Sequence, residues 1–215
     1  MRHFMMFAVA MMVSVGFTAD AEAGKKDKGT DAAESAGEDL ALEDSGIDSV
    51  DELFAKAKAP IDTIKTARTK VDAVAPNLNK ALDLPAGTPF ADALADLKSK
   101  AEGKLEVGMD GDVPTIKAAD GMPANVQGAI DGLNTGVKEA VDATMKLAEV
   151  PAQVQEVIAA AKSFDPKSIK PVTAVPKATK ALTGNLKVLG KAPGEVEALV
   201  QSVDNMKKDL LGLKG

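Results

Sequence analysis

The stretch that decides the fold is residues 126–161, VQGAIDGLNTGVKEAVDATMKLAEVPAQVQEVIAAA. Mostly apolar side chains recur along it at alternating spacings of three and four, which places them on one face of an α-helix. This stripe predicts long helices that pack through a narrow, coiled-coil-like seam. The seam positions are Val126, Ile130, Leu133, Val137, Ala140, Thr144, Leu147, Pro151, Val154, Ile158 and Ala161.

The same register continues toward the carboxyl end of the chain. Apolar residues seven apart stay in phase with Val126, so residues 175–210 are also expected to be helical and to pack along the same kind of seam. These positions are Val175, Leu182, Leu189, Val196, Val203 and Leu210.

A second stripe lies toward the amino end, over residues 50–81, and predicts another long helix. A turn at residues 84–87 follows it. Thr88 and Pro89 then suit the start of a shorter helix, because a proline in the first helical position loses no hydrogen bond. The stripe positions are Val50, Leu53, Ala57, Pro60, Ile64, Ala67, Val71, Val74, Leu78 and Ala81.

Prolines interrupt these patterns. A proline inside a helix removes a backbone hydrogen bond and bends the helix. We expect bends at Pro60 and Pro151, where the seam continues without a glycine; the alternative is that each proline opens a new helix. We expect a break at residues 190–193, where Gly190 suits a helix end and Pro193 a helix start.

Two glycine-containing segments carry local predictions. Residues 106–121 break the helical pattern and are expected to form an irregular loop; the alternative is a short hairpin, because Asp110-Gly111 suits a tight turn. Glycines 128, 132 and 136 lie four apart inside the predicted helix, and this spacing favours a close approach by another helix.

Residues 24–46 precede the helical pattern. They are acidic and rich in small polar residues, and Leu40 and Leu42 are their only large apolar side chains before the predicted helices. Such a segment cannot bury enough surface to offset the entropy of ordering, so we expect a disordered linker. The sequence therefore predicts an all-α fold: an elongated antiparallel helical bundle over residues 47–215 behind this linker.

Residues 1–23 resemble the layout of a secretory signal peptide. A basic start is followed by an apolar run over residues 4–17 and then by Ala21-Glu22-Ala23, the small-x-small pattern that precedes cleavage. We expect cleavage after Ala23 and a periplasmic or secreted location. The alternative is that the segment stays attached as an anchor.

The composition excludes several kinds of chemistry. The only histidine is His3, inside the predicted leader, and the chain has no cysteine, tryptophan or tyrosine. Nucleophilic pairs that need histidine or cysteine, and zinc or copper sites, are therefore not expected. Asp110-Gly111-Asp112 begins like a calcium loop, but Pro114 occupies a ligand position. We predict no enzyme activity and no catalytic, cofactor-binding or metal-binding residues.

Two functional hypotheses remain. The first is an exported structural or protein-interaction protein (a scaffold, spacer or chaperone-like accessory) that binds a protein partner or itself. The alternative is a protein that binds lipid surfaces through amphipathic helices, with the lysine-rich residues 162–191 on anionic headgroups. For the lysines themselves, the main interpretation is that they face the acidic half of the chain within one fold, and the alternative is a basic strip for an anionic surface. With a net charge of −6, the chain is a poor candidate for nucleic-acid binding, and no small-molecule substrate is expected.

Overall fold

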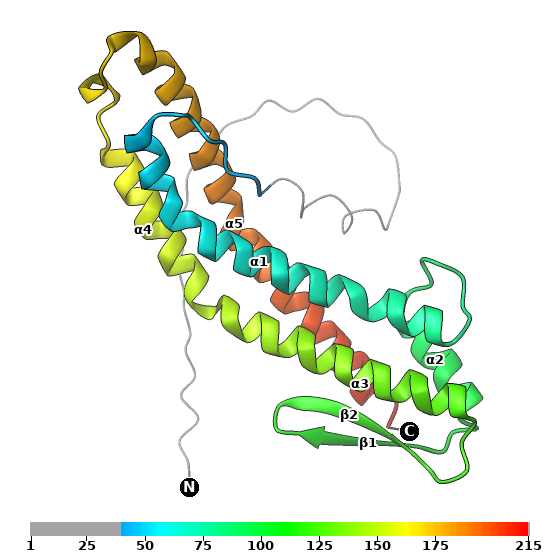
Figure 1. The fold of residues 1–215 in the computed structure, drawn as a ribbon. Coiled ribbons are helices and arrows are strands. Elements are labelled where there is room, and N and C mark those ends of the chain that lie inside the picture. Colours follow the sequence, from blue (N-terminus) through cyan, green and yellow to red (C-terminus); the bar gives the residue numbers. More distant parts are fainter. Residues whose placement is uncertain (1–39, 215) are drawn as a thin grey trace, which may run out of the picture. The chain divides into compact units, whose positions relative to one another are not determined.

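The computed structural model describes residues 40–214, and 73% of them are helical. Four long helices and one shorter helix dominate this part of the chain, together with a small two-stranded sheet (Figure 1). The predicted leader, residues 1–23, and residues 24–39 of the predicted linker lie outside the described residues. The elements are α1 (Asp48–Ala81), α2 (Phe90–Lys100), β1 (Leu105–Asp110), β2 (Val113–Ala118), α3 (Ala124–Met145), η1 (Lys146–Glu149), α4 (Val150–Ser163), η2 (Pro166–Ser168), η3 (Val172–Ala174) and α5 (Val175–Leu211).

The predicted seams form the core. Helix α1 packs against α3, α4 and α5, and α4 also packs against α5. Eight of the ten stripe positions on α1 are buried; Leu53 is half-buried, and Ala81 is exposed at the end of the helix. On α5, every ladder position except the half-buried Val175 is buried. The helical stripes therefore find their partners within one chain, and this burial supplies the main driving force for folding.

The prolines differ from the prediction at two places, Pro193 and Pro151. Helix α5 is continuous from Val175 to Leu211, so the break predicted at residues 190–193 is wrong. Ala192 and Val196 are both buried beside Pro193. The packing of these flanking residues offsets the backbone hydrogen bond that the proline removes, so the helix continues past it.

The other two seam prolines give one continuous helix and one new start. Pro60 is buried inside α1, which runs without interruption through it and through Pro76. Pro151 lies in the first turn of α4, directly after the 3-10 turn η1 that separates it from α3. The alternative reading, in which a proline opens a new helix, is therefore correct at Pro151.

Residues 105–118 form an antiparallel hairpin, so the expected irregular loop is wrong and its alternative is correct. Leu105 pairs with Ala118 and Asp110 with Val113, which leaves Gly111 and Asp112 as the two loop residues. Gly111 has φ +60°. A hairpin loop with glycine first at positive φ matches the twist of the two strands. The strand β2 packs on α3 and α5, with Ile116 buried.

The last part of the predicted linker is packed. In residues 40–46, Leu40 and Ser45 are buried and Leu42 is half-buried. Backbone groups of this segment bond to side chains of α1 and α5. The folded part of the chain therefore includes Leu40, six residues before the expected end of the linker, because two helices supply the partners that its sequence alone lacks.

Candidate interaction surface

Three helical asparagines hold the non-helical segments in place. The amide of Asn185, fully buried on α5, makes two bonds with residue 43: the Glu43 N–H donates to Oδ1 (2.7 Å), and Nδ2 donates to the Glu43 carbonyl (3.0 Å). Asn134 on α3 makes the same pair of hydrogen bonds with Ile116 of β2. The Ile116 N–H donates to Oδ1, and Nδ2 donates to the Ile116 carbonyl, both at 2.8 Å. On α1, the Nδ2 group of Asn79 donates to the Thr88 carbonyl (2.9 Å). We call these three residues the asparagine clamps.

The sequence analysis missed the clamps, although one signal was present. Asn185 lies between Leu182 and Leu189 at a spacing of three and four, so it occupies a seam position. A polar side chain on an apolar seam indicates a specific buried partner. Here the partner is the backbone of residue 43 rather than another helix.

Asp51 fixes the entry into α1. Its carboxylate accepts hydrogen bonds from the Ser45 N–H (2.8 Å), the Ser45 hydroxyl (2.7 Å) and the Ile47 N–H (3.1 Å). Burial raises the pKa of Asp51, but the hydrogen bonds from Ser45 and Ile47 outweigh it, so the pKa lies below its usual value. The carboxylate therefore works as a structural acceptor in its ionised form.

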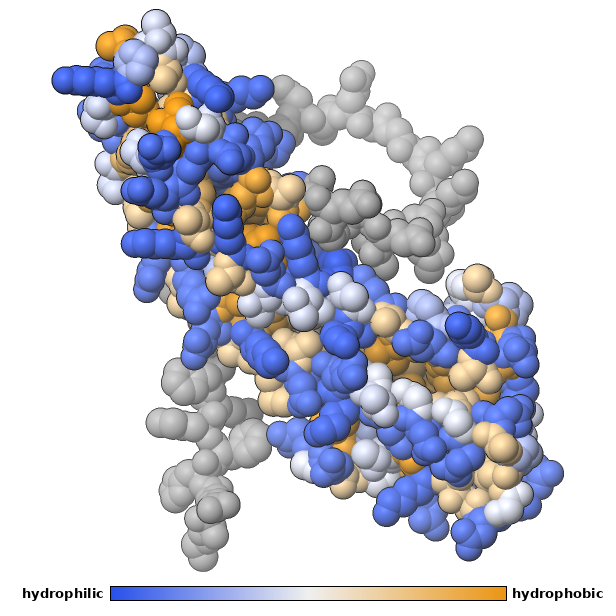
Figure 2. Space-filling view, in the orientation of Figure 1, coloured by the Kyte–Doolittle hydropathy of each residue, from blue (hydrophilic) through white to orange (hydrophobic). Residues whose placement is uncertain are grey.

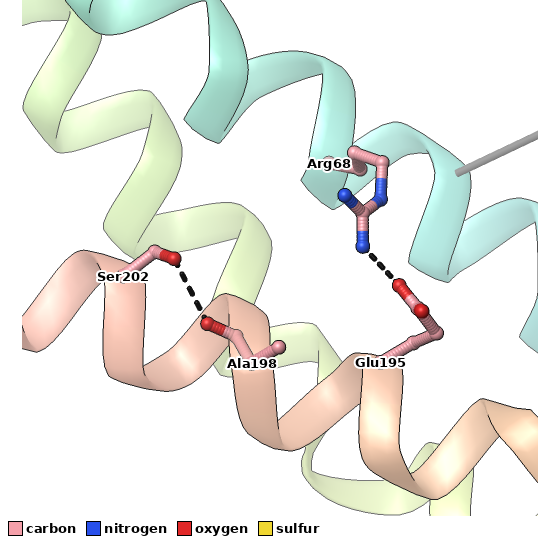
Figure 3. A network of polar contacts seen from close by, with 4 residues as sticks. All are labelled: Arg68, Glu195, Ala198 and Ser202. Atoms are coloured by element: carbon pink, nitrogen blue, oxygen red, sulfur yellow. Dashed lines mark hydrogen bonds and ion pairs between the residues drawn. The ribbon is translucent and has the colours of Figure 1, made fainter. Parts of the chain in front are cut away.

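An ion pair joins α1 to α5 at mid-length. Figure 3 shows the Arg68 guanidinium directed at the Glu195 carboxylate, and both side chains are about 15% exposed. Burial and the nearby Glu195 raise the pKa of Asp72, while Arg68 opposes that rise. On the same face of α5, the Ser202 hydroxyl donates to the Ala198 carbonyl (2.9 Å) (Figure 3). The ion pair is thus a contact between two helices, the Ser202 bond lies within α5, and none of these residues lines the α1–α4 groove described below.

An open groove of about 680 Å³ lies between α1 and α4. Its apolar lining includes Leu53, Pro60, Val157 and Phe164, and Ala59 and Ala160 are small residues in its wall. Charged and polar groups accompany them: Glu52, Lys56, Gln153 and Glu156. We call this hollow the α1–α4 groove.

The lining follows helical spacing on both sides. Positions 49, 52, 53, 56, 59 and 60 come from α1, and 153, 156, 157, 160 and 164 come from α4 and the residue after it. Each set is one face of a helix. The groove is thus formed by one face of each of two neighbouring helices, and it borders the core, because Pro60 and Val157 of its lining are buried.

Nothing in residues 40–214 combines into a metal site: no three acidic side chains there lie close enough to hold an ion. No helix in the same range is both long enough and apolar enough to cross a membrane. Comparison with protein-family models, curated proteins and solved structures finds no significant match to this chain. The features of the described residues that bear on function are the α1–α4 groove and the exposed charges.

Proposed function

We propose that this chain is an exported, non-enzymatic structural or protein-interaction protein. Its leader-like residues 1–23 support export to the periplasm or the medium. The proposal includes the arrangement expected from the sequence, an elongated antiparallel helical bundle behind an acidic linker. Because the apolar stripes are buried between helices of one chain, the structure favours a folded interaction protein over separate helices that lie flat on lipid.

The observation that carries the proposal is the α1–α4 groove. It is open, partly apolar and bounded by two helices, which is the geometry in which a further helix can lie. Small side chains at Ala59 and Ala160 allow the backbone of such a helix to approach closely. The half-buried side chains of Leu53 and Phe164 supply apolar surface that it would bury.

The charges of the groove define the partner further. Two carboxylates, Glu52 and Glu156, and one ammonium group, Lys56, line it. A partner helix with an apolar stripe flanked by lysine or arginine matches this arrangement. We therefore propose an amphipathic, basic helix of another protein as the occupant of the groove.

Site-specific photocrosslinking in the cells that produce the protein tests this proposal. A photoreactive amino acid replaces Ala160 in the groove, and the matched control replaces Ala198, an exposed alanine of α5. We expect one discrete adduct from position 160 and none from position 198. The adduct should disappear when Ala59→Arg is added, because the long cationic side chain obstructs the groove and repels a basic helix.

Mass spectrometry of the adduct should then place the crosslink in a basic amphipathic helix. Equal adducts from positions 160 and 198, or no adduct from either, would argue against the groove as the binding site. Size-exclusion chromatography with light scattering gives an independent check, because a compact monomer with no co-purifying partner contradicts an interaction role.

A further inference from the structure

The turn between α4 and α5 has a charge opposite to that of the whole chain. Residues 162–180 contain five lysines and a single carboxylate, Asp165, whereas the chain carries a net charge of −6. All five lysines are exposed, and none forms an ion pair with another described residue. We call this segment the basic turn; its lysines are Lys162, Lys167, Lys170, Lys177 and Lys180.

The one carboxylate of the basic turn, Asp165, bonds to the backbone of the turn itself. The Asp165 side chain accepts a hydrogen bond from the Lys167 N–H (2.9 Å) and caps the short helix η2. The Ser168 hydroxyl donates to the Asp165 carbonyl (2.7 Å). Asp165 thus bonds to the backbone of its own turn. Lys177 lies with its Nζ beside Gly46, whereas Lys162, Lys167 and Lys170 are exposed around the turn itself.

The turn is fixed in shape and has an apolar apex. Ile169 is buried and anchors the segment, and both η2 and η3 pack on α5. Three residues further along, Val172 is 76% exposed, the most exposed of the large hydrophobic residues in the described part. Pro166 and Pro171 restrict the backbone on either side. Figure 1 shows this turn at one end of the helices, and Figure 2 shows hydrophobic atoms there among hydrophilic ones.

We propose that the basic turn is a docking site for the surface of an anionic lipid bilayer. Lysines attract acidic headgroups over about a Debye length, while the apolar apex enters the interface between them. A bilayer fits better than an acidic protein because Val172 is a strongly exposed apolar side chain among lysines, and a bilayer accepts such a side chain without a matching pocket. The net negative charge of the remaining chain would orient this end toward the membrane. The site does not depend on the α1–α4 groove.

A single introduced cysteine tests the contact directly, because the chain has no cysteine of its own. Val172→Cys in the full chain carries an environment-sensitive nitrobenzoxadiazole label. Met109→Cys, on the hairpin and 53% exposed, is the matched control. Vesicles of phosphatidylcholine with phosphatidylglycerol should shift the emission at position 172 to shorter wavelength. Phosphatidylcholine alone should not, and position 109 should stay unchanged with either vesicle.

A charge-matched pair of variants tests the lysines. Lys162→Gln, Lys167→Gln and Lys170→Gln together should weaken binding to the anionic vesicles by roughly a hundredfold. The control triple at Lys117, Lys138 and Lys208, all exposed on other elements, removes the same charge and should change binding by less than about threefold. Circular dichroism should show both triples folded, because only exposed side chains change.

Three results would overturn the proposal. The first is no shift at position 172 on anionic vesicles. The second is an equal shift at positions 172 and 109, or on both vesicle types, which would indicate general association through another part of the chain. The third is equal weakening by the two lysine triples, which would make net charge alone responsible.

Discussion

At the scale of single residues, the structure depends on polar side chains that satisfy backbone groups outside the helices. Asn185 is the clearest case, because a fully buried amide replaces the backbone partners that residue 43 would find in a sheet. A buried polar group that loses its partner keeps its desolvation cost, so such contacts matter more when broken than their net strength suggests.

Replacing Asn185 with alanine should destabilise the protein by about 1–3 kcal/mol, because the N–H and carbonyl of Glu43 lose both bonds. Urea unfolding measures this cost. The control Asn205→Ala, at an exposed position of the same helix, should stay within about 0.5 kcal/mol. Amide exchange at residues 40–46 should accelerate only in the Asn185 variant; equal exchange in both variants would show that the clamp does not hold this segment.

Asp51 predicts a pH dependence. A carboxylate whose pKa is lowered by folding stabilises the native state at pH values above its unfolded pKa, and that contribution is lost as the pH falls through the folded pKa. Asp51→Asn should therefore cost about 1 kcal/mol at pH 7 and progressively less below about pH 4. Asp48→Asn, in the same turn, is the control. A cost that is independent of pH would contradict the role given to the ionised group.

At the scale of elements, the sequence predicted the helices well and the interruptions poorly. Helical periodicity translates directly into burial, so the ladder from Leu182 to Leu210 could be read in advance. Whether Pro193 breaks a helix depends on packing on both sides of it, which a local pattern does not contain. The hairpin was likewise decided by contacts of β2 with α3 and α5.

The glycine series 128, 132 and 136 gave a partly wrong prediction. A Cβ atom at Gly136 would lie 3.7 Å from Val74 of α1, so this glycine does face a neighbouring helix. At positions 128 and 132 a Cβ atom would meet nothing within 4 Å. The four-residue spacing therefore predicted a contact with a neighbouring helix correctly only at Gly136.

Two alanine substitutions should consequently have opposite signs. Gly111→Ala forces a side chain into the positive-φ position of the hairpin loop and should cost about 1 kcal/mol. Gly128→Ala adds a methyl group in open space inside α3 and should stabilise by about 0.5–1 kcal/mol, because alanine loses less backbone entropy. Thermal unfolding compares the two variants, and a change of the same sign in both would refute the assignment of these backbone states.

At the scale of the whole described unit, distant helices are joined by their seams and by one half-buried ion pair. The seams explain why the fold class was predictable. The α1–α4 groove was not predictable, because its position depends on which faces of α1 and α4 come to lie side by side. The sequence contained the groove residues without any sign that they would adjoin.

The pair of Arg68 and Glu195 gives a prediction at this scale. Arg68→Met should destabilise by about 3 kcal/mol, because it leaves the partner carboxylate largely desolvated and unpaired. The double variant with Glu195→Met should recover most of that loss, since two apolar side chains then pack between α1 and α5. A double-mutant cycle by urea unfolding measures the coupling. Strictly additive effects would mean that the pair contributes nothing.

The attachment of residues 40–46 to α5 also decides how mechanical load enters the protein. Tension on the chain ahead of Leu40 reaches the first third of α5, the longest described helix, at Asn185 before it reaches the first turn of α1. The two hydrogen bonds of the Asn185 side chain then share the force with the packing of the buried Leu40 side chain. The first turn of α1 is thereby shielded from peeling, and a strained amino-terminal segment pulls on the core as a whole.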